Sequence, residues 1–191
     1  LKDLLKTGDV IYVKKIKENN FDLMQEPAVS GEKVIEMYCD GPETLSSKNH
    51  LRSTGIGESL DKATAMKKSL NEAKTKLAGS VETQIKATID NYVNSREMNN
   101  KEQVEERFEA LSREVINQKL ANVVTICKKL TQKTDGSNKY VYYCAIEMKA
   151  KDIIEAINER ITKEETLRID YDYEKFKETF DKEMEKLEKG L

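Results

Sequence analysis

Side chains that commonly carry enzyme chemistry are scarce in this chain. It contains one histidine, His50, and three cysteines, Cys39, Cys127 and Cys144, which form no Cys-x-x-Cys pair. One histidine cannot make a two-histidine metal site, and it leaves a Cys-His-Asp arrangement no choice of partners. We therefore interpret His50 as a surface or cross-strand residue. The cysteines are either one disulfide and one free thiol or three small buried hydrophobic residues, and their odd number favours the second interpretation.

The acidic residues are spaced for structure rather than for catalysis. On the predicted helices they lie four residues from lysines, as Glu72 does from Lys76, which is the spacing of helical ion pairs. Asp170 and Asp172 begin no calcium loop, because the glycine and the final glutamate that such a loop requires are absent. The sequence thus predicts a protein that is not an enzyme and that holds no cofactor or metal.

A glycine pair, Gly55 and Gly57, lies between a predicted strand and a predicted helix. A dinucleotide-binding fingerprint would have a third glycine where this chain has Leu60, and no Gly-Lys-Ser/Thr motif follows. Phosphate binding is therefore the weaker interpretation. The stronger one is that the two glycines allow close contact where the strand bends into the helix.

The longest periodic stretch, Ser59–Arg96, predicts one amphipathic helix on the order of 50 Å long, with Ser59 as its N-cap. Its apolar residues recur every three or four positions and so share one face: Ala63, Met66, Leu70, Ala73, Leu77, Val81, Ile85, Ile89 and Tyr92. Gly79 within it predicts a kink or a close contact, since glycine is unfavourable inside a helix. A sheet or other helices must cover a stripe of this length.

Two β-rich stretches, 120–132 and 139–149, are separated by an Asp-Gly turn, which predicts a β-hairpin. A turn centred on Gly136 places even-numbered residues on one apolar face: Val124, Ile126, Leu130, Tyr142, Cys144 and Ile146. In that register Cys127 points away from Cys144. A register shifted by one residue would place the two cysteines opposite each other but would turn a lysine inward, so we favour the first.

Secondary structure is also predicted for the segments on either side of the long helix. Short strands are predicted at Val10–Val13 and Val34–Tyr38, before a turn at Cys39–Glu43. Residues 49–57 alternate apolar and polar side chains, which predicts a strand leading into the long helix. Beyond that helix, Asn100 is the predicted N-cap of a second helix that ends near residue 119.

Two helices close the sequence. The first has Asp152 as its predicted cap and turns four isoleucines to the core: Ile153, Ile154, Ile157 and Ile161. The last has an apolar stripe with lysines and glutamates between its members: Ile169, Tyr173, Phe176, Phe180, Met184 and Leu187. This stripe packs either within the protein or on another copy of the chain, and the intramolecular alternative is favoured.

Charge and hydropathy exclude several kinds of partner. The chain has 33 basic and 35 acidic residues and a formal net charge of −2, so no overall field attracts nucleic acid or an anionic membrane. The chain has no run of eighteen apolar residues, so no membrane span is predicted. No charged-then-apolar segment begins at Leu1, so no signal peptide is predicted there. We expect a soluble chain with no nucleic-acid partner.

A resemblance to the Lpp-twenty lipoprotein family of bacterial envelopes is carried by three stretches: HLRSTGIGESLDKATAMKKSLNEAKTKLAGSV, EALSREVINQKLANVVTICKKL and KYVYYCAIEMK. The matching features are a strand ending near Gly-x-Gly, a helix with repeated alanines and the Leu77-Ala78 pair, and a closing hairpin with Tyr-Tyr. The stretch YCDGPETLSSKNHLRSTGIGES is similar to family members from gut Bacteroidetes. Together these features cover the chain from about His50 to Lys149.

The resemblance implies a β-α-β-β unit in which a curved antiparallel sheet wraps a long helix, similar in shape to dodecin. It also implies a lipid-anchored protein of the cell envelope, at the periplasm or cell surface, without an established activity. A mature lipoprotein begins with an acylated cysteine, which this chain lacks, so the anchor is inferred to have been lost with a leader. Contact with a membrane is expected only through that anchor.

We therefore predict an α+β protein in which a long helix packs on a curved antiparallel sheet, with additional C-terminal helices. Its predicted parts are an N-terminal arm (1–48), a β-α-β-β core (49–150) and C-terminal helices packed on that core (151–191).

The predicted function is structural or protein-interacting, with the chain itself or other envelope proteins as partners. The alternative is a small-ligand carrier that binds between sheet and helix. The surfaces expected to act are the sheet edge, the tyrosine-rich hairpin and the last helix, represented by Tyr140, Tyr143, Phe176 and Phe180. Ordinary filling of the strand is the competing explanation for the tyrosines.

Overall fold

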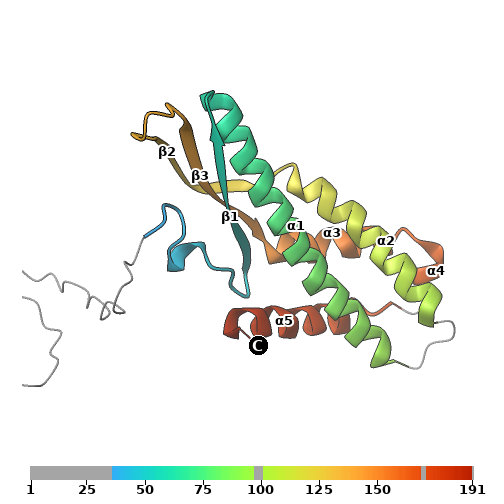
Figure 1. Ribbon diagram of the computed structural model, residues 1–191. Coiled ribbons are helices and arrows are strands. Elements are labelled where there is room, and N and C mark those ends of the chain that lie inside the picture. Colours follow the sequence, from blue (N-terminus) through green and yellow to red (C-terminus); the bar gives the residue numbers. More distant parts are fainter. Residues whose placement is uncertain (1–35, 97–100, 169–170, 191) are drawn as a thin grey trace, which may run out of the picture. The chain divides into compact units, whose positions relative to one another are not determined.

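The computed structural model describes residues 36–96, 101–168 and 171–190 (Figure 1). The helices and strands, in chain order, are β1 (His50–Ser59), α1 (Lys62–Asn94), α2 (Lys101–Leu120), β2 (Val124–Gln132), β3 (Tyr140–Lys149), α3 (Ala150–Ile161), α4 (Glu165–Arg168) and α5 (Tyr173–Lys189). A 3-10 turn at Pro42–Thr44 precedes them, and Met37–Leu191 forms one compact unit. The predicted α+β class is confirmed, with α2 inserted between the long helix and the hairpin.

The sheet is antiparallel with strand order β1-β3-β2, and α1 lies along one of its faces. Gly55 and Gly57 of β1 lie directly beneath α1. A Cβ atom added at Gly55 would overlap the backbone oxygen of Ser69, and one added at Gly57 would overlap that of Ala65. Only glycine therefore lets α1 approach β1 this closely. The close-contact interpretation of the glycine pair is confirmed.

α1 is one helix of 33 residues, slightly shorter than predicted. Its N-cap is Asp61 and not Ser59, which is the last residue of β1. The Asp61 carboxylate accepts a hydrogen bond from the Thr64 N–H at 2.8 Å and so satisfies a free donor of the first turn. The helix continues through Gly79, and a Cβ atom there would have no neighbour within 4 Å. The predicted close contact at Gly79 is wrong.

The buried side of α1 follows the predicted stripe in its later turns but not at its start. Ala63 is exposed and Met66 is 43% exposed, whereas Ala65 and Ser69 are fully buried. The cause is tertiary, because the two glycines of β1 bring the helix so close that only small side chains fit between. At this end the sheet, and not hydrophobicity, decides which residues of α1 are buried.

β2 and β3 form the predicted hairpin in the favoured register. Leu130 pairs with Tyr142, as expected for a turn centred on residue 136. A bulge between Thr125 and Cys127 then shifts the register by one residue. Because side chains alternate along a strand, Val124 lies on the face opposite Leu130. The predicted single face of even-numbered residues is therefore wrong at the start of β2.

The core continues from the sheet along α1 to the C-terminal helices. α2 and α5 flank the part of α1 that extends beyond the sheet (Figure 1). Four aromatic rings gather there, with centroids between 5.2 and 6.2 Å apart: Tyr92, Phe108, Tyr171 and Phe176. α3 buries all four predicted isoleucines, and α5 buries Phe176, Phe180 and Met184. Intramolecular packing of the last helix is confirmed.

The remaining differences from the sequence predictions are local. The residue before α3, Lys149, makes no side-chain cap, and Asp152 lies within the first turn, so the predicted cap is wrong. Met37 and Tyr38 form no strand. The rest of that predicted strand, the strand predicted at Val10–Val13, the predicted cap Asn100 and the residue Ile169 of the last stripe lie outside the described residues.

Candidate interaction surface

β2 is the least covered strand of the sheet. A helix with its side chains is about 10 Å across and neighbouring strands lie about 4.8 Å apart, so one helix covers two strands. α1 lies over β1 and β3 and leaves β2 largely open. On the α1 face of β2, Leu130 is 42% exposed. Ile126, at the bulge, is 39% exposed, and Val124, which the bulge turns to the opposite face, is 60% exposed. In the part of the chain that the structure describes, no strand pairs with the outer edge of β2.

The first turns of α1 add to this open surface. The ammonium group of Lys62 lies 5.0 Å from the ring centre of Tyr140 on β3, so this flank of α1 faces β3. Met66 follows one turn later on the same flank and is 43% exposed. We name β2 and Met66 together the β2 surface.

The β2 surface is basic. β2 carries Lys128 and Lys129 and no carboxylate. At the hairpin end, Lys133 and Lys139 both pair with the carboxylate of Glu58. Hydrogen bonds from these two ammonium groups hold the pKa of Glu58 below its ordinary value. Counting the hairpin turn, four lysines thus face two local carboxylates, Glu58 and Asp135, so β2 and its hairpin end are positive although the whole chain is slightly acidic.

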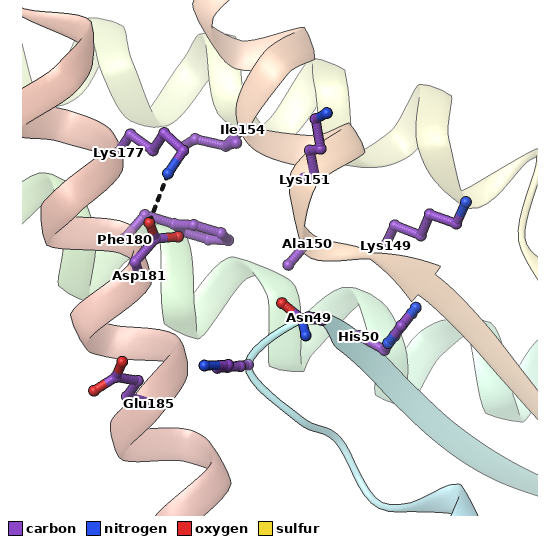
Figure 2. Close-up of a pocket in the computed structure, with 11 residues that line it drawn as sticks. Asn49, His50, Lys149, Ala150, Lys151, Ile154, Lys177, Phe180, Asp181 and Glu185 are labelled. Carbon is purple, nitrogen blue, oxygen red and sulfur yellow. Dashed lines mark hydrogen bonds and ion pairs between the residues drawn. The ribbon is translucent and has the colours of Figure 1, made fainter.

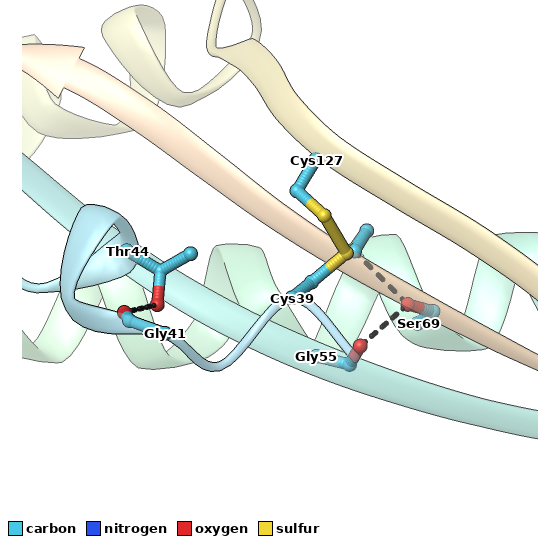
Figure 3. The surroundings of a disulfide bond; sticks show 7 residues. Cys39, Gly41, Thr44, Gly55, Ser69 and Cys127 are labelled. Carbon is cyan, nitrogen blue, oxygen red and sulfur yellow. Dashed lines mark hydrogen bonds between the residues drawn. A yellow bond between two sulfur atoms is a disulfide. The ribbon is translucent and has the colours of Figure 1, made fainter. Parts of the chain in front are cut away.

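The opposite face of the sheet is joined to the segment that precedes β1. Cys39 and Cys127 form a disulfide with their Cα atoms 5.6 Å apart (Figure 3). Beside it, the Tyr38 ring lies edge-on against Tyr143 of β3 at a centroid distance of 5.4 Å. The favoured prediction of three unpaired buried cysteines is wrong, because the chain has one disulfide and one free thiol.

The free thiol, Cys144, lies on the α1 side of the sheet and is fully buried. The Ser69 hydroxyl donates to the Gly55 carbonyl at 2.8 Å (Figure 3). The sulfur of Cys144 lies 3.0 Å from that hydroxyl. Burial raises the pKa of the Cys144 thiol, so the thiolate that would react is disfavoured. Cys144 is therefore a structural residue, and it points away from Cys127 as the favoured register predicts.

The four residues predicted to form an interaction surface do not come together. Phe176 and Phe180 are 0% and 1% exposed, so neither contributes to the surface. Tyr140 is half-buried in β3, and Tyr143 is half-buried against Tyr38. The competing explanation, in which the tyrosines fill the strand, fits these positions better.

The apolar residues of the β2 surface were missed because the sequence assigned them to the core. Val124, Ile126 and Leu130 alternate as they would under a covering helix, and alternation does not tell which strand a helix covers. The available signal was the pair of lysines beside them, Lys128 and Lys129, since charged side chains are typical of edge strands.

A hollow of about 460 Å³ lies where α5 meets the start of β1 and the start of α3 (Figure 2). Phe180 and Ile154 give it apolar walls, and its charged groups are of both signs, with the Lys177 ammonium 2.8 Å from the Asp181 carboxylate. Figure 2 shows Lys149 pointing away from Phe180. These described lining residues form no convergent polar group, so we assign no ligand to the hollow.

His50 also lines that hollow, and it has the cross-strand position that the sequence predicts. It lies in β1, and its Nε2 atom is 3.7 Å from the Glu147 carboxylate of β3. In the described part of the chain, no group of three or more His, Cys, Asp or Glu side chains is placed to hold a metal ion. No helix described there has the length and apolar character needed to cross a membrane.

Comparisons of the chain with protein family models, with curated proteins and with solved structures give no match. The resemblance to the Lpp-twenty family therefore stays a prediction from the sequence.

Proposed function

We propose that this chain is a non-catalytic protein-interaction domain of the cell envelope, and that its β2 surface binds an extended, acidic segment of another protein. The observation that carries the proposal is β2 itself, an edge strand of nine residues with exposed apolar side chains on both of its faces. An open strand edge presents backbone donors and acceptors in a row, and an extended peptide satisfies them by adding a strand.

The charge of the β2 surface favours an acidic partner over a second copy of the chain. Two β2 strands paired antiparallel would bring Lys128 and Lys129 close to the same lysines of the other copy, and like charges facing each other across strands are unfavourable. Glutamate or aspartate opposite these lysines would instead be favourable.

The disulfide supports the envelope location. Structural disulfides persist in the periplasm and at the cell surface and are rare in the cytosol, where thiols are kept reduced. The Cys39–Cys127 bond joins residues 88 positions apart, so folding in a reducing compartment would lose a long-range constraint. The lipid anchor belongs to the same proposal and is supported only by the family resemblance.

Carriage of a small ligand between sheet and helix is the weaker alternative. The backbone of α1 occupies the space above Gly55 and Gly57, which leaves no room for a ligand between α1 and this part of β1.

The test uses the full chain and two short synthetic peptides, one alternating valine with glutamate and the other alternating valine with lysine. We expect the acidic peptide to bind and to shift the amide resonances of β2. Reversing both charges in Lys128→Glu/Lys129→Glu should weaken this binding by about tenfold or more. The matched control, Lys151→Glu/Lys163→Glu, makes the same charge change at exposed positions far along the chain and should leave binding unchanged.

Several results would contradict the proposal. Equal affinity for both peptides would exclude an acidic partner, and absence of binding would exclude strand addition. Dimerisation that Leu130→Asp abolishes would assign the surface to a second copy of the chain. Binding to vesicles of anionic lipid without binding of either peptide would assign it to a membrane.

A further inference from the structure

A second hollow, the α1–α2 cleft, lies between those two helices and has a volume of about 370 Å³. Its apolar side chains are Ile85 and Ile89 of α1 and Ile116 of α2, each at most 2% exposed. Lys86 of α1 and Glu109 of α2 also line the cleft, form an ion pair with each other and are partly exposed. The cleft therefore has an apolar floor and a charged mouth.

Ser112 of α2 brings a buried polar group to this cleft. The residue is 2% exposed, and in the described part of the chain its hydroxyl has no hydrogen-bond partner. Buried hydroxyls in helices often donate to the carbonyl four residues earlier, as the buried Thr88 of α1 does to the Gln84 carbonyl at 2.7 Å. An unpaired buried hydroxyl destabilises the folded protein, and nearly all such groups in proteins have a hydrogen-bond partner. Ser112 is therefore available to a bound molecule.

Gly79 of α1 keeps the wall of the cleft open. It lines the cleft, and a Cβ atom there would have no neighbour within 4 Å. Glycine within a helix is unfavourable, and no close contact in the described structure requires it here. A larger side chain at this position would extend into the space that the cleft provides.

We propose that the α1–α2 cleft binds a small, uncharged and mostly apolar molecule with one hydroxyl or carbonyl group. That group hydrogen-bonds with Ser112 Oγ, which can both donate and accept, and the apolar part contacts the three isoleucines. An ionised ligand is disfavoured, because the floor carries no charge and the charged residues that line the rest of the cleft, Glu82, Lys86, Glu109 and Arg113, are of both signs. The cleft is near the small end of known ligand pockets, which suits a single-ring or short-chain molecule.

The test titrates the full chain with benzyl alcohol, toluene and benzoate and follows amide resonances of α1 and α2. We expect benzyl alcohol to bind more tightly than toluene, and benzoate not to bind. Ser112→Ala should weaken the binding of benzyl alcohol by about three- to tenfold and leave the binding of toluene unchanged. Gly79→Leu should weaken both by more than about tenfold, because leucine fills the cleft while favouring the helix. The matched control is Asn71→Leu, at an exposed position of α1 outside the cleft.

The proposal fails if no probe shifts the resonances of the cleft, which would mean that water alone occupies it. It also fails if Ser112→Ala weakens toluene as much as benzyl alcohol, since the hydroxyl would then act only through the fold. Should Gly79→Leu not fold, Glu82→Trp at the exposed mouth blocks the same cleft and must weaken both probes. None of these outcomes bears on the β2 surface, so the two proposals stand or fall separately.

Discussion

Glycine has opposite consequences at different positions of this chain. At Gly55 and Gly57 the backbone of α1 occupies the space in which a Cβ atom would lie, whereas at Gly79 that space is empty. On β1 the missing side chain therefore allows close contact between strand and helix. On α1 it leaves the α1–α2 cleft open, and it increases the freedom of the unfolded chain, which lowers helix stability.

Two alanine variants separate these consequences. Gly57→Ala should lower the free energy of unfolding by about 2 kcal/mol or more, because α1 must move away from β1 to admit the methyl group. Gly79→Ala should raise it by about 0.5–1 kcal/mol. Urea denaturation of both variants measures the two values. A neutral Gly57→Ala would contradict the close approach of α1 to β1.

Among the described residues, the phenol of Tyr171 has a strongly raised pKa. Its ring lies among those of Tyr92, Phe108 and Phe176, and its hydroxyl is buried without a hydrogen-bond partner among the described residues. Burial is the main cause that raises the pKa of Tyr171 above its ordinary value near 10, and negative charge at neighbouring groups adds to it. The folded protein therefore keeps this proton where the unfolded chain releases it.

The raised pKa of Tyr171 makes the free energy of unfolding depend on pH above pH 10. Above pH 10 the unfolded chain binds fewer protons than the folded one, so the free energy of unfolding falls by about 1.4 kcal/mol per pH unit. Tyr171→Phe should remove this loss and should be neutral or stabilising below pH 10, since no hydrogen bond is lost. Urea denaturation of both proteins between pH 8 and 11 tests this. Parallel pH profiles would show that Tyr171 ionises freely in the folded state.

At the scale of the elements, the disulfide connects the segment before β1 to the edge of the sheet. It joins Cys39 to Cys127, at the bulge of β2, on the face opposite α1. The same segment contacts the sheet through Tyr38, whose ring lies against Tyr143 and 5.3 Å from the Lys129 ammonium group. One covalent bond, one aromatic contact and one cation–π contact thus hold this segment against the face of the sheet opposite α1.

Replacing both bonded cysteines in Cys39→Ser/Cys127→Ser should lower the free energy of unfolding by about 2–4 kcal/mol, because the unfolded chain regains freedom. Helix content should stay the same, since the helices bury their apolar faces without the disulfide. Denaturation and far-UV circular dichroism measure the two quantities. Cys144→Ala, which keeps the disulfide, is the control and should lower the free energy of unfolding by less than the double variant does. Unchanged stability after loss of the bond would contradict this account.

At the scale of the whole unit, one apolar core runs from the sheet along α1 to α5. Leu51 of β1, Leu77 of α1 and Met184 of α5 are all fully buried members of it. The C-terminal helices are therefore part of the same core and do not depend on a partner for burial.

A pair of aromatic substitutions tests this continuity. Phe176→Ala should lower the free energy of unfolding by about 3–5 kcal/mol, because it leaves a cavity among the three remaining rings of the cluster. Tyr143→Ala, at a half-buried position on the face of the sheet opposite α1, should lower the free energy of unfolding by about 1–2 kcal/mol. Equal effects of the two variants, or two separate unfolding transitions with Phe176→Ala, would show that α5 is not part of the core.

Local patterns were enough to predict most elements. The long helix, the hairpin and its register, and the isoleucines of α3 were found because helical and strand periodicities are properties of neighbouring residues. The failures at Met66, Val124 and Cys39 have one cause. Each depends on what lies across the sheet: close glycines, a bulge, or a second cysteine distant in the sequence.

The sequence by itself determined the α+β class, the scarcity of catalytic groups and the apolar side of most elements. Tertiary structure alone decided which apolar side is covered. One helix spans only two strands, so the exposed β2 surface and the α1–α2 cleft arise from the widths and spacing of packed elements. Such distances between elements are not encoded in any local stretch of residues.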